Sequence, residues 1–328
     1  MSTRILEPGE IGQVAPFPHL VLPTDNDLFA HRARRFAQLA SGHPMADFLH
    51  AMQALALAQH SAYLATPAEP IDADALQPSR QHGMPPLSYQ SSRREHGWQR
   101  DLEAIITSLT VQAVAAWQPA LQQLAALDAV GREALADAVL HGAVADSNPL
   151  QHAAVAPVIG AALQVWWTRQ AASLQVDDIG HVGSATVCPV CAARPVASVV
   201  DIGASQANLR YLHCSLCSTQ WHMVRVTCSA CESTKGVAYY SLNADQESAT
   251  PSRKLAFARA ETCDACHSYL KIFSREKEPH MEASADDLAT LALDLLVDQA
   301  GYLRSGPNLL FSPGIAVDEP SSGAAIDS

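Results

Sequence analysis

The placement of the cysteines constrains this 328-residue chain more than any other feature. All eight lie between positions 188 and 266, and each belongs to a Cys-x-x-Cys pair. Two thiolates three positions apart can close a tight loop, or knuckle, on one metal ion, and each knuckle supplies half of a tetrahedral S4 site. Four knuckles predict two mononuclear metal sites, and the candidate ligands are Cys188, Cys191, Cys214, Cys217, Cys228, Cys231, Cys263 and Cys266.

The segments between the knuckles repeat. An apolar run from Val196 to Ile202, a polar turn and a second run from Leu209 to His213 separate the first two knuckles. The runs Gly236 to Leu242 and Leu255 to Glu261, with a longer polar turn, separate the last two. A strand-like run also follows each second knuckle. This tandem ribbon pattern predicts that the knuckles pair in sequence order, the first with the second and the third with the fourth.

Three other uses of the cysteines fit less well. A disulfide framework is disfavoured because the chain is long and lacks a secretory leader, and because a bridge between cysteines this close is strained. A thioredoxin-like redox pair needs one Cys-x-x-Cys that opens a helix, not four on ribbons. The closely successive cysteines of a compact ferredoxin cluster are also absent. Reduced thiols of this kind indicate the cytoplasm.

The spacing leaves the metal open, because tetrahedral thiolate suits both iron and zinc. The knuckle Cys188-Pro-Val-Cys191 is rubredoxin-like. However, the residues that follow the second cysteine of each knuckle, where rubredoxin usually carries glycine, are Ala192, Ser218, Glu232 and His267.

The charge distribution argues against a nucleic-acid-binding ribbon. The chain has a formal net charge of −12, and residues 181–280 carry 10 basic and 8 acidic side chains. Eight thiolates and two divalent ions would turn even this segment slightly acidic. A ribbon that binds phosphates needs a surplus of Lys and Arg, so no nucleic-acid partner is expected.

The first half of the chain predicts helices. Asp25 can cap a helix that ends at Gly42, and further helices are predicted over residues 44–65, 97–126, 131–140 and 150–174. Residues 66–95 contain five prolines and predict a loop. The most apolar window, Ala153 to Trp167, is too short to cross a bilayer, so no membrane partner is expected.

Outside the knuckles no residue set predicts catalysis. His43 and His50 are interpreted as helix-end histidines that cap or face water, and Trp166 and Trp167 as core. The chain has no His-Glu-x-x-His, no Gly-x-Ser-x-Gly and no phosphate-binding Gly-rich loop. We therefore expect no catalytic residues and no enzymatic activity of its own.

A last helix is predicted from Ser284, its cap, to Asp298, with an acidic exposed face and a stop at Gly301. Asp286 and Asp287 fall in its first turn, where acidic groups favourably oppose the helix dipole.

These elements predict an α+β chain with an all-helical domain, two tandem rubredoxin-like or zinc-ribbon metal modules and a C-terminal helix. The expected segments are an extended N-terminal segment (1–24), the helical domain (25–178), the first ribbon (179–227), the second ribbon (228–280), the C-terminal helix with its extension (281–311) and a disordered tail (312–328).

Several runs carry a family resemblance. They are Leu209 to Arg225 with the knuckle Cys228-Ser-Ala-Cys231, Ala260 to Lys271, Ala285 to Asp294, Gly301 to Asn308 and, near the start, Leu28 to Phe36 through Gly42-His-Pro44. Together they resemble the signature of the formate dehydrogenase accessory protein family, FdhE. The resemblance is dense from Cys188 to Asn308 and looser before it.

The resemblance implies a cytoplasmic maturation factor or chaperone that binds the molybdenum-containing catalytic subunit of respiratory formate dehydrogenase before export. It also implies rubredoxin-like iron at the knuckles, so iron is favoured over zinc for the two ions. In the leading hypothesis the metals hold docking modules for the client subunit. In the alternative, a redox-active iron site acts on the client's active site.

Overall fold

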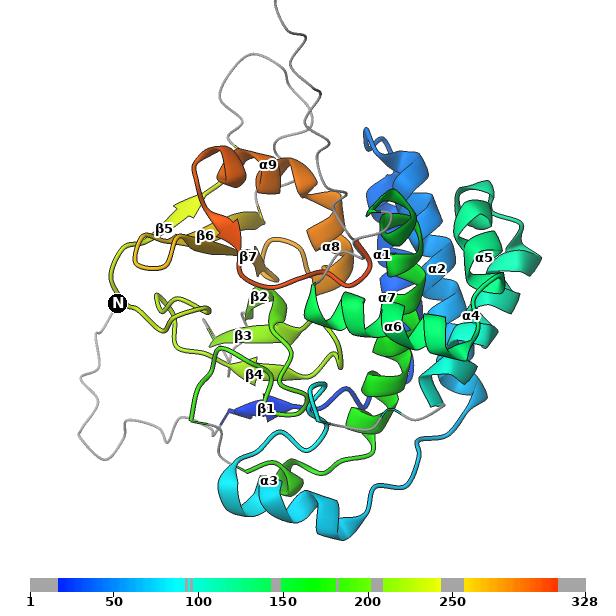
Figure 1. Cartoon of the computed structure of the whole chain (residues 1–328). Helices are drawn as coiled ribbons and strands as arrows, with labels where there is room; N and C mark the ends of the chain where they lie inside the picture. Colours follow the sequence, from blue (N-terminus) through cyan, green and yellow to red (C-terminus); the bar gives the residue numbers. More distant parts are fainter. Residues whose placement is uncertain are drawn as a thin grey trace, which may run out of the picture.

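The computed structural model of the chain describes residues 17–91, 94, 97–142, 149–180, 183–201, 209–242 and 257–311. Most helices form one side of the molecule and a mixed sheet the other, with α8 (Ala283–Ala289) between them and α9 (Leu291–Gln299) packed on the sheet (Figure 1). This is the predicted α+β architecture. The predicted tail, the first 16 residues and the polar turns of the two ribbons lie outside the described residues.

Helix α7 lies at the centre of the helical side and contacts four other helices. Its described side chains from Val155 to Ala171 are buried, including Trp166 and Trp167, as predicted. His50 is exposed, and His43 is half-buried with its Nε2 atom 3.0 Å from the Ala289 carbonyl oxygen. The helices of this side are α1 (Leu28–Ala40), α2 (Ala46–Ala65), α4 (Gly97–Gln112), α5 (Gln118–Ala125), α6 (Ala129–His141) and α7 (Pro149–Ala172), and the short α3 (Gln77–His82) lies apart from them, below the sheet in Figure 1.

Two predictions for the helical side were wrong in detail. The predicted helix 97–126 is broken at Ala113, whose φ is 52°, and resumes as α5 after a short 3₁₀ turn. In that turn the indole of Trp117 is buried and donates a hydrogen bond of 3.0 Å to the Ala51 carbonyl of α2. The predicted loop 66–95 contains α3 and a preceding 3₁₀ turn (Ala73–Leu76). Among the described residues no helix combines the length and apolar character needed to cross a bilayer.

The two ribbons form one continuous sheet. Its order is β1-β4-β3-β2-β7-β6-β5, and β8 pairs with β7. Neighbouring strands within each ribbon are antiparallel, but β2 and β7 run parallel with Ser198 opposite Ile272, which joins the ribbons. The strands are β1 (Leu20–Val21), β2 (Pro195–Asp201), β3 (Leu209–Cys214), β4 (Gln220–His222), β5 (Val237–Tyr240), β6 (Ala258–Cys263), β7 (Ser268–Ser274) and β8 (Leu303–Arg304).

The C-terminal helix differs from its prediction. It is divided at Thr290 into α8 (Ala283–Ala289) and α9 (Leu291–Gln299), and its cap is Glu282, whose carboxylate accepts a 2.7 Å hydrogen bond from Ala285 N. Asp286 lies in the first turn, as predicted, but Asp286 and Asp287 are both fully buried. The exposed side of α9 is not a row of acids either, since Leu295 is 66% exposed on it.

Candidate metal centres

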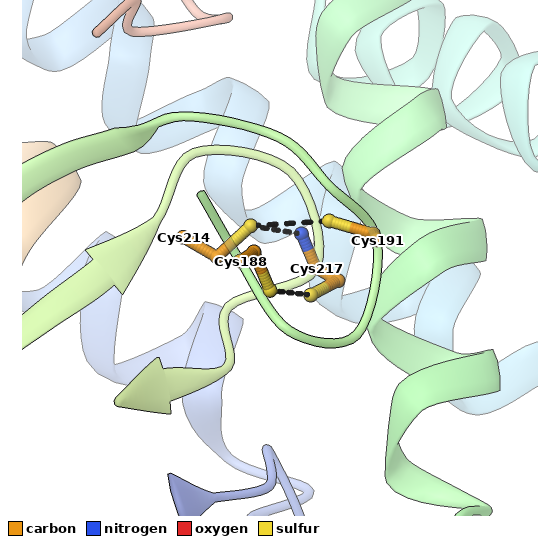
Figure 2. Close-up of side chains that lie close together, drawn as sticks. All are labelled: Cys188, Cys191, Cys214 and Cys217. Carbon is orange, nitrogen blue, oxygen red and sulfur yellow. Dashed lines mark hydrogen bonds between the residues drawn. The ribbon is translucent and has the colours of Figure 1, made fainter. Parts of the chain in front are cut away.

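The inner cluster consists of Cys188, Cys191, Cys214 and Cys217. The first two lie on a knuckle that precedes β2, and the last two on a knuckle that begins at the end of β3. Figure 2 shows the four side chains converging between the two loops. The Sγ atoms of Cys188 and Cys217 are 3.6 Å apart, those of Cys191 and Cys214 are 3.3 Å apart, and all four lie within 4.8 Å of one another. Tetrahedral bonds of about 2.3 Å place sulfurs about 3.8 Å apart, so this set fits one metal ion.

The outer cluster consists of Cys228, Cys231, Cys263 and Cys266. Its Sγ atoms are 3.7 Å apart for Cys228 and Cys266 and 3.8 Å apart for Cys231 and Cys263, and the whole set again lies within 4.8 Å. The structure thus brings the first knuckle to the second and the third to the fourth, as the tandem pattern predicts. Both clusters could hold a metal ion.

All four knuckles adopt the same turn without glycine. The residue after the second cysteine has a positive φ in every case, at 63° in Ala192, 59° in Ser218, 60° in Glu232 and 51° in His267. This left-handed conformation is the one that favours glycine. Each non-glycine residue at these positions therefore adopts the backbone conformation that glycine would favour.

Hydrogen bonds to sulfur accompany the turns. The amides of Leu216 and Cys217 donate to Cys214 Sγ at 3.4 Å, and the amide of Ala230 donates to Cys228 Sγ at 3.3 Å. Such bonds stabilise a thiolate, because charged acceptors form the stronger hydrogen bonds.

Burial shapes the acidity of the inner thiols. It raises the pKa of Cys188 and of Cys191 well above the usual value, because an uncompensated thiolate is costly in an apolar environment. Burial opposes ionisation of Cys217 too, but hydrogen bonds with the other three cysteines and with the Thr219 hydroxyl hold its pKa well below the usual value. A divalent cation would compensate the four thiolates, so the donor set fits a metal.

The outer thiols lie in two environments. Burial raises the pKa of Cys228 to about 12. Partial burial would also raise the pKa of Cys266, but hydrogen bonds with the Ser268 hydroxyl, 2.9 Å away, and with Cys231 and Cys228 lower it to about 7. Cys231 and Cys266 are exposed, whereas the inner cluster has no exposed cysteine.

The helical side covers the inner knuckles. Gln164 and Thr168, one turn apart on α7, contact the second knuckle through the Ser215 carbonyl at 2.8 Å and the Ser218 hydroxyl at 3.2 Å. The amide of Tyr89 donates to the Cys191 carbonyl at 3.0 Å on the first knuckle. The four inner cysteines consequently belong to the main hydrophobic core.

Buried ion pairs tie the C-terminal helices to both sides of the molecule. Asp286 binds Arg35 of α1 at 2.6 Å. Asp287 binds Lys271 of β7 at 3.2 Å and Arg304 of β8 at 2.7 Å, and it accepts a 2.8 Å hydrogen bond from the Asn308 amide.

Sequence reasoning missed this network. Its signal was present, because the runs Leu28 to Phe36, Ala285 to Asp294 and Gly301 to Asn308 carry the family resemblance although they contain no cysteine.

One cavity of about 260 Å³ lies between the N-terminal segment, the inner ribbon and the residues that precede α8. His31, Arg32, His213, Cys214 and Glu282 contribute to its wall. Cys214 is the inner cysteine that reaches this wall.

These observations define a class: a helical domain joined to a double ribbon with two four-cysteine clusters, each of which could hold a metal ion. Comparison with known proteins identifies the family. Family models described as FdhE N-terminal, central domain and C-terminal domain match residues 17–183, 187–225 and 226–311. The chain belongs to the FdhE family.

Relatives match over nearly the whole chain. A protein named FdhE homolog from Pseudomonas aeruginosa is 44% identical over 316 residues, which cover 96% of this chain and 99% of that one. The FdhE homolog of Edwardsiella ictaluri is 42% identical, covering 93% and 94%, and the FdhE protein of Escherichia coli is 36% identical, covering 96% and 99%. The crystal structure of the FdhE protein from Pseudomonas aeruginosa superimposes with a TM-score of 0.80 at 44% identity, covering 90% of this chain and all of that one.

Proposed function

We propose that this chain is an accessory factor for formate dehydrogenase. It binds the molybdenum-containing catalytic subunit in the cytoplasm and assists its assembly before export. The observation that carries the proposal is the match to FdhE proteins over 93–96% of the chain, in a structure that groups all eight cysteines into two sets of four.

The two clusters would bind one metal ion each, with iron favoured, and would hold the docking surface in shape. A ribbon of this size buries too little apolar surface to fold alone, and metal binding supplies the missing folding free energy. The inner ion would fix the ribbon to the helical side, and the outer ion would fix the far end of the sheet. In this proposal the metals contribute by holding the docking surface in shape.

The test is a titration of the purified catalytic subunit with the full chain carrying two ions, followed by calorimetry. We expect saturable binding, and a large loss of affinity after the ions are removed by a chelator. The catalytic subunit of an unrelated molybdenum enzyme serves as the control. Absence of binding by the metal-containing protein would contradict the accessory role, and unchanged affinity after metal removal would contradict the structural role of the ions.

The exposure of Cys231 and Cys266 favours one second candidate. A partner's redox centre could approach an iron ion in the outer cluster from this side. This candidate predicts a reversible change between Fe(III) and Fe(II) at a physiological potential. Full activity of a zinc-only protein in client maturation would exclude it.

A further inference from the structure

The two ribbons place equivalent residues in opposite environments. In the second knuckle of the inner ribbon, residues 214–217 are all buried. In the equivalent knuckle of the outer ribbon, Cys263 is buried but residues 264–267 are exposed. In the first knuckles, Cys191 is buried and its equivalent Cys231 is exposed. The two clusters thus have the same four-cysteine ligand set but differ in the solvent exposure of their cysteines.

The cause of the difference is the helical side. It covers the inner knuckles with α7 and the segment at Tyr89. The outer second knuckle is contacted mainly by the segment after α9, where the Tyr302 hydroxyl donates to Asp264 at 2.6 Å and the Leu303 amide donates to the His267 carbonyl at 2.8 Å. These contacts leave Cys266 exposed.

Each outer knuckle supplies one buried and one exposed sulfur. Cys228 and Cys263 are 4% and 1% exposed, so two ligands are anchored in the sheet. Cys231 and Cys266 lie on the open side. An ion held in this way can lose its exposed ligands while the buried pair keeps it in place.

We propose that the outer cluster is a metal-exchange site that passes its ion to and from external thiolates, while the inner cluster retains its ion. The inference rests on the proposed metal binding at both clusters. Each external thiolate that binds the ion would replace one cysteine, first Cys231 or Cys266 on the open side and then the buried pair. Each released cysteine thiolate would take up a proton from the solvent. No electron is transferred.

The cavity beside the inner ribbon does not make the inner cluster as accessible to solvent as the outer cluster. It reaches Cys214, which is 4% exposed, whereas Cys188, Cys191 and Cys217 are fully buried and do not line it. A thiolate that replaces one inner ligand still leaves three buried sulfurs on the ion. Release of the inner ion therefore requires the ribbon to separate from α7.

The experiment follows metal loss from the full chain after mixing with excess 2,3-dimercaptosuccinate, with the ions that remain bound counted by mass spectrometry of the desalted protein. We expect one ion to leave at least roughly tenfold faster than the other, since the shell around a metal site controls access to it. The rate of the fast phase should rise in proportion to the dithiol concentration. The rate of the slow phase should not depend on it.

Variants assign the two phases. Cys228→Ala with Cys263→Ala, which removes the buried pair that anchors the outer ion, should abolish the fast phase and leave one slowly released ion. Thr168→Ala, which removes a contact over the inner knuckle, should speed the slow phase and leave the fast phase unchanged. Equal release rates for both ions, or a fast phase that survives in Cys228→Ala with Cys263→Ala, would overturn the exchange site. Fewer than two ions in the starting protein would instead overturn the metal assignment itself, and the inference with it.

Discussion

At the scale of single residues, the left-handed residue of each knuckle controls the direction of the chain around the sulfurs. Ala192, Ser218, Glu232 and His267 adopt this conformation with side chains that disfavour it. Glu232 illustrates a compensation, because its carboxylate accepts hydrogen bonds from the Ala185 amide at 2.8 Å and the Ser184 hydroxyl at 3.0 Å. Ala192 has only a methyl group and no such compensation.

Ala192→Gly is therefore expected to stabilise the protein. Glycine relieves the strain of the left-handed conformation but loses more chain entropy on folding. The net effect is expected to raise the free energy of unfolding by about 0.5–1 kcal/mol. The measurement is the unfolding free energy from denaturant titration at fixed metal content. The matched control is the neighbouring Ala193→Gly, because Ala193 is buried and has no positive φ. The control should destabilise the protein, and a shift of the same sign in both variants would contradict the argument.

At the scale of elements, α8 connects the helical side to the sheet through its two consecutive acids. Asp286 points to α1 and Asp287 to β7 and β8. Burial alone would lower the pKa of Arg35, but the hydrogen bond and the charge of Asp286 raise it, so the guanidinium stays charged in the core. Removal of Arg35 leaves the buried Asp286 without its counter-ion, and removal of Asp286 leaves Arg35 with only the longer ion pair to Glu278 at 3.4 Å.

A double-mutant cycle on Arg35 and Asp286 measures this connection. Each single change to alanine is expected to cost about 3–5 kcal/mol, and the double change much less than the sum. The control is the pair Arg80 and Asp178, in which the Arg80 side chain is 49% exposed. Its coupling should stay below about 1 kcal/mol. Equal coupling energies in the two cycles would show that α8 is not held by its buried pair.

The knuckles, their pairing and the strands between them were predictable because they depend on local spacing. The broken helix at Ala113 was not, because it follows from the contact of Trp117 with α2, 66 residues away in sequence. The burial of Asp286 was not predictable for the same reason, since its partner lies 251 residues away. The helix dipole explains an acidic residue at this position from local structure alone, but Asp286 forms its ion pair with a residue of another helix.

At the scale of the whole molecule, one sheet joins two ribbons that differ in their relation to the core. The parallel pairing of β2 with β7 makes the sheet continuous. The inner cysteines nevertheless belong to the main core with the helices, whereas no outer cysteine does, and most buried apolar residues of the outer ribbon lie in two smaller clusters, one of which they share with β2. An ion in the inner cluster should therefore support the whole fold, and an ion in the outer cluster the far part of the sheet.

Two variants, each of which lacks one knuckle of one ribbon, test this division of the fold. All five tryptophans precede Cys228, so tryptophan fluorescence reports the helical side and the inner ribbon. Cys188→Ser with Cys191→Ser should lower the thermal midpoint of that signal by well over ten degrees, or prevent folding, because it removes an ion from the main core.

Cys228→Ser with Cys231→Ser should leave the midpoint nearly unchanged and abolish binding of the catalytic subunit, because the docking surface loses its outer end. Equal shifts in the two variants would contradict the division of the core. Normal client binding by the outer variant would show that the outer ribbon does not form part of the docking surface.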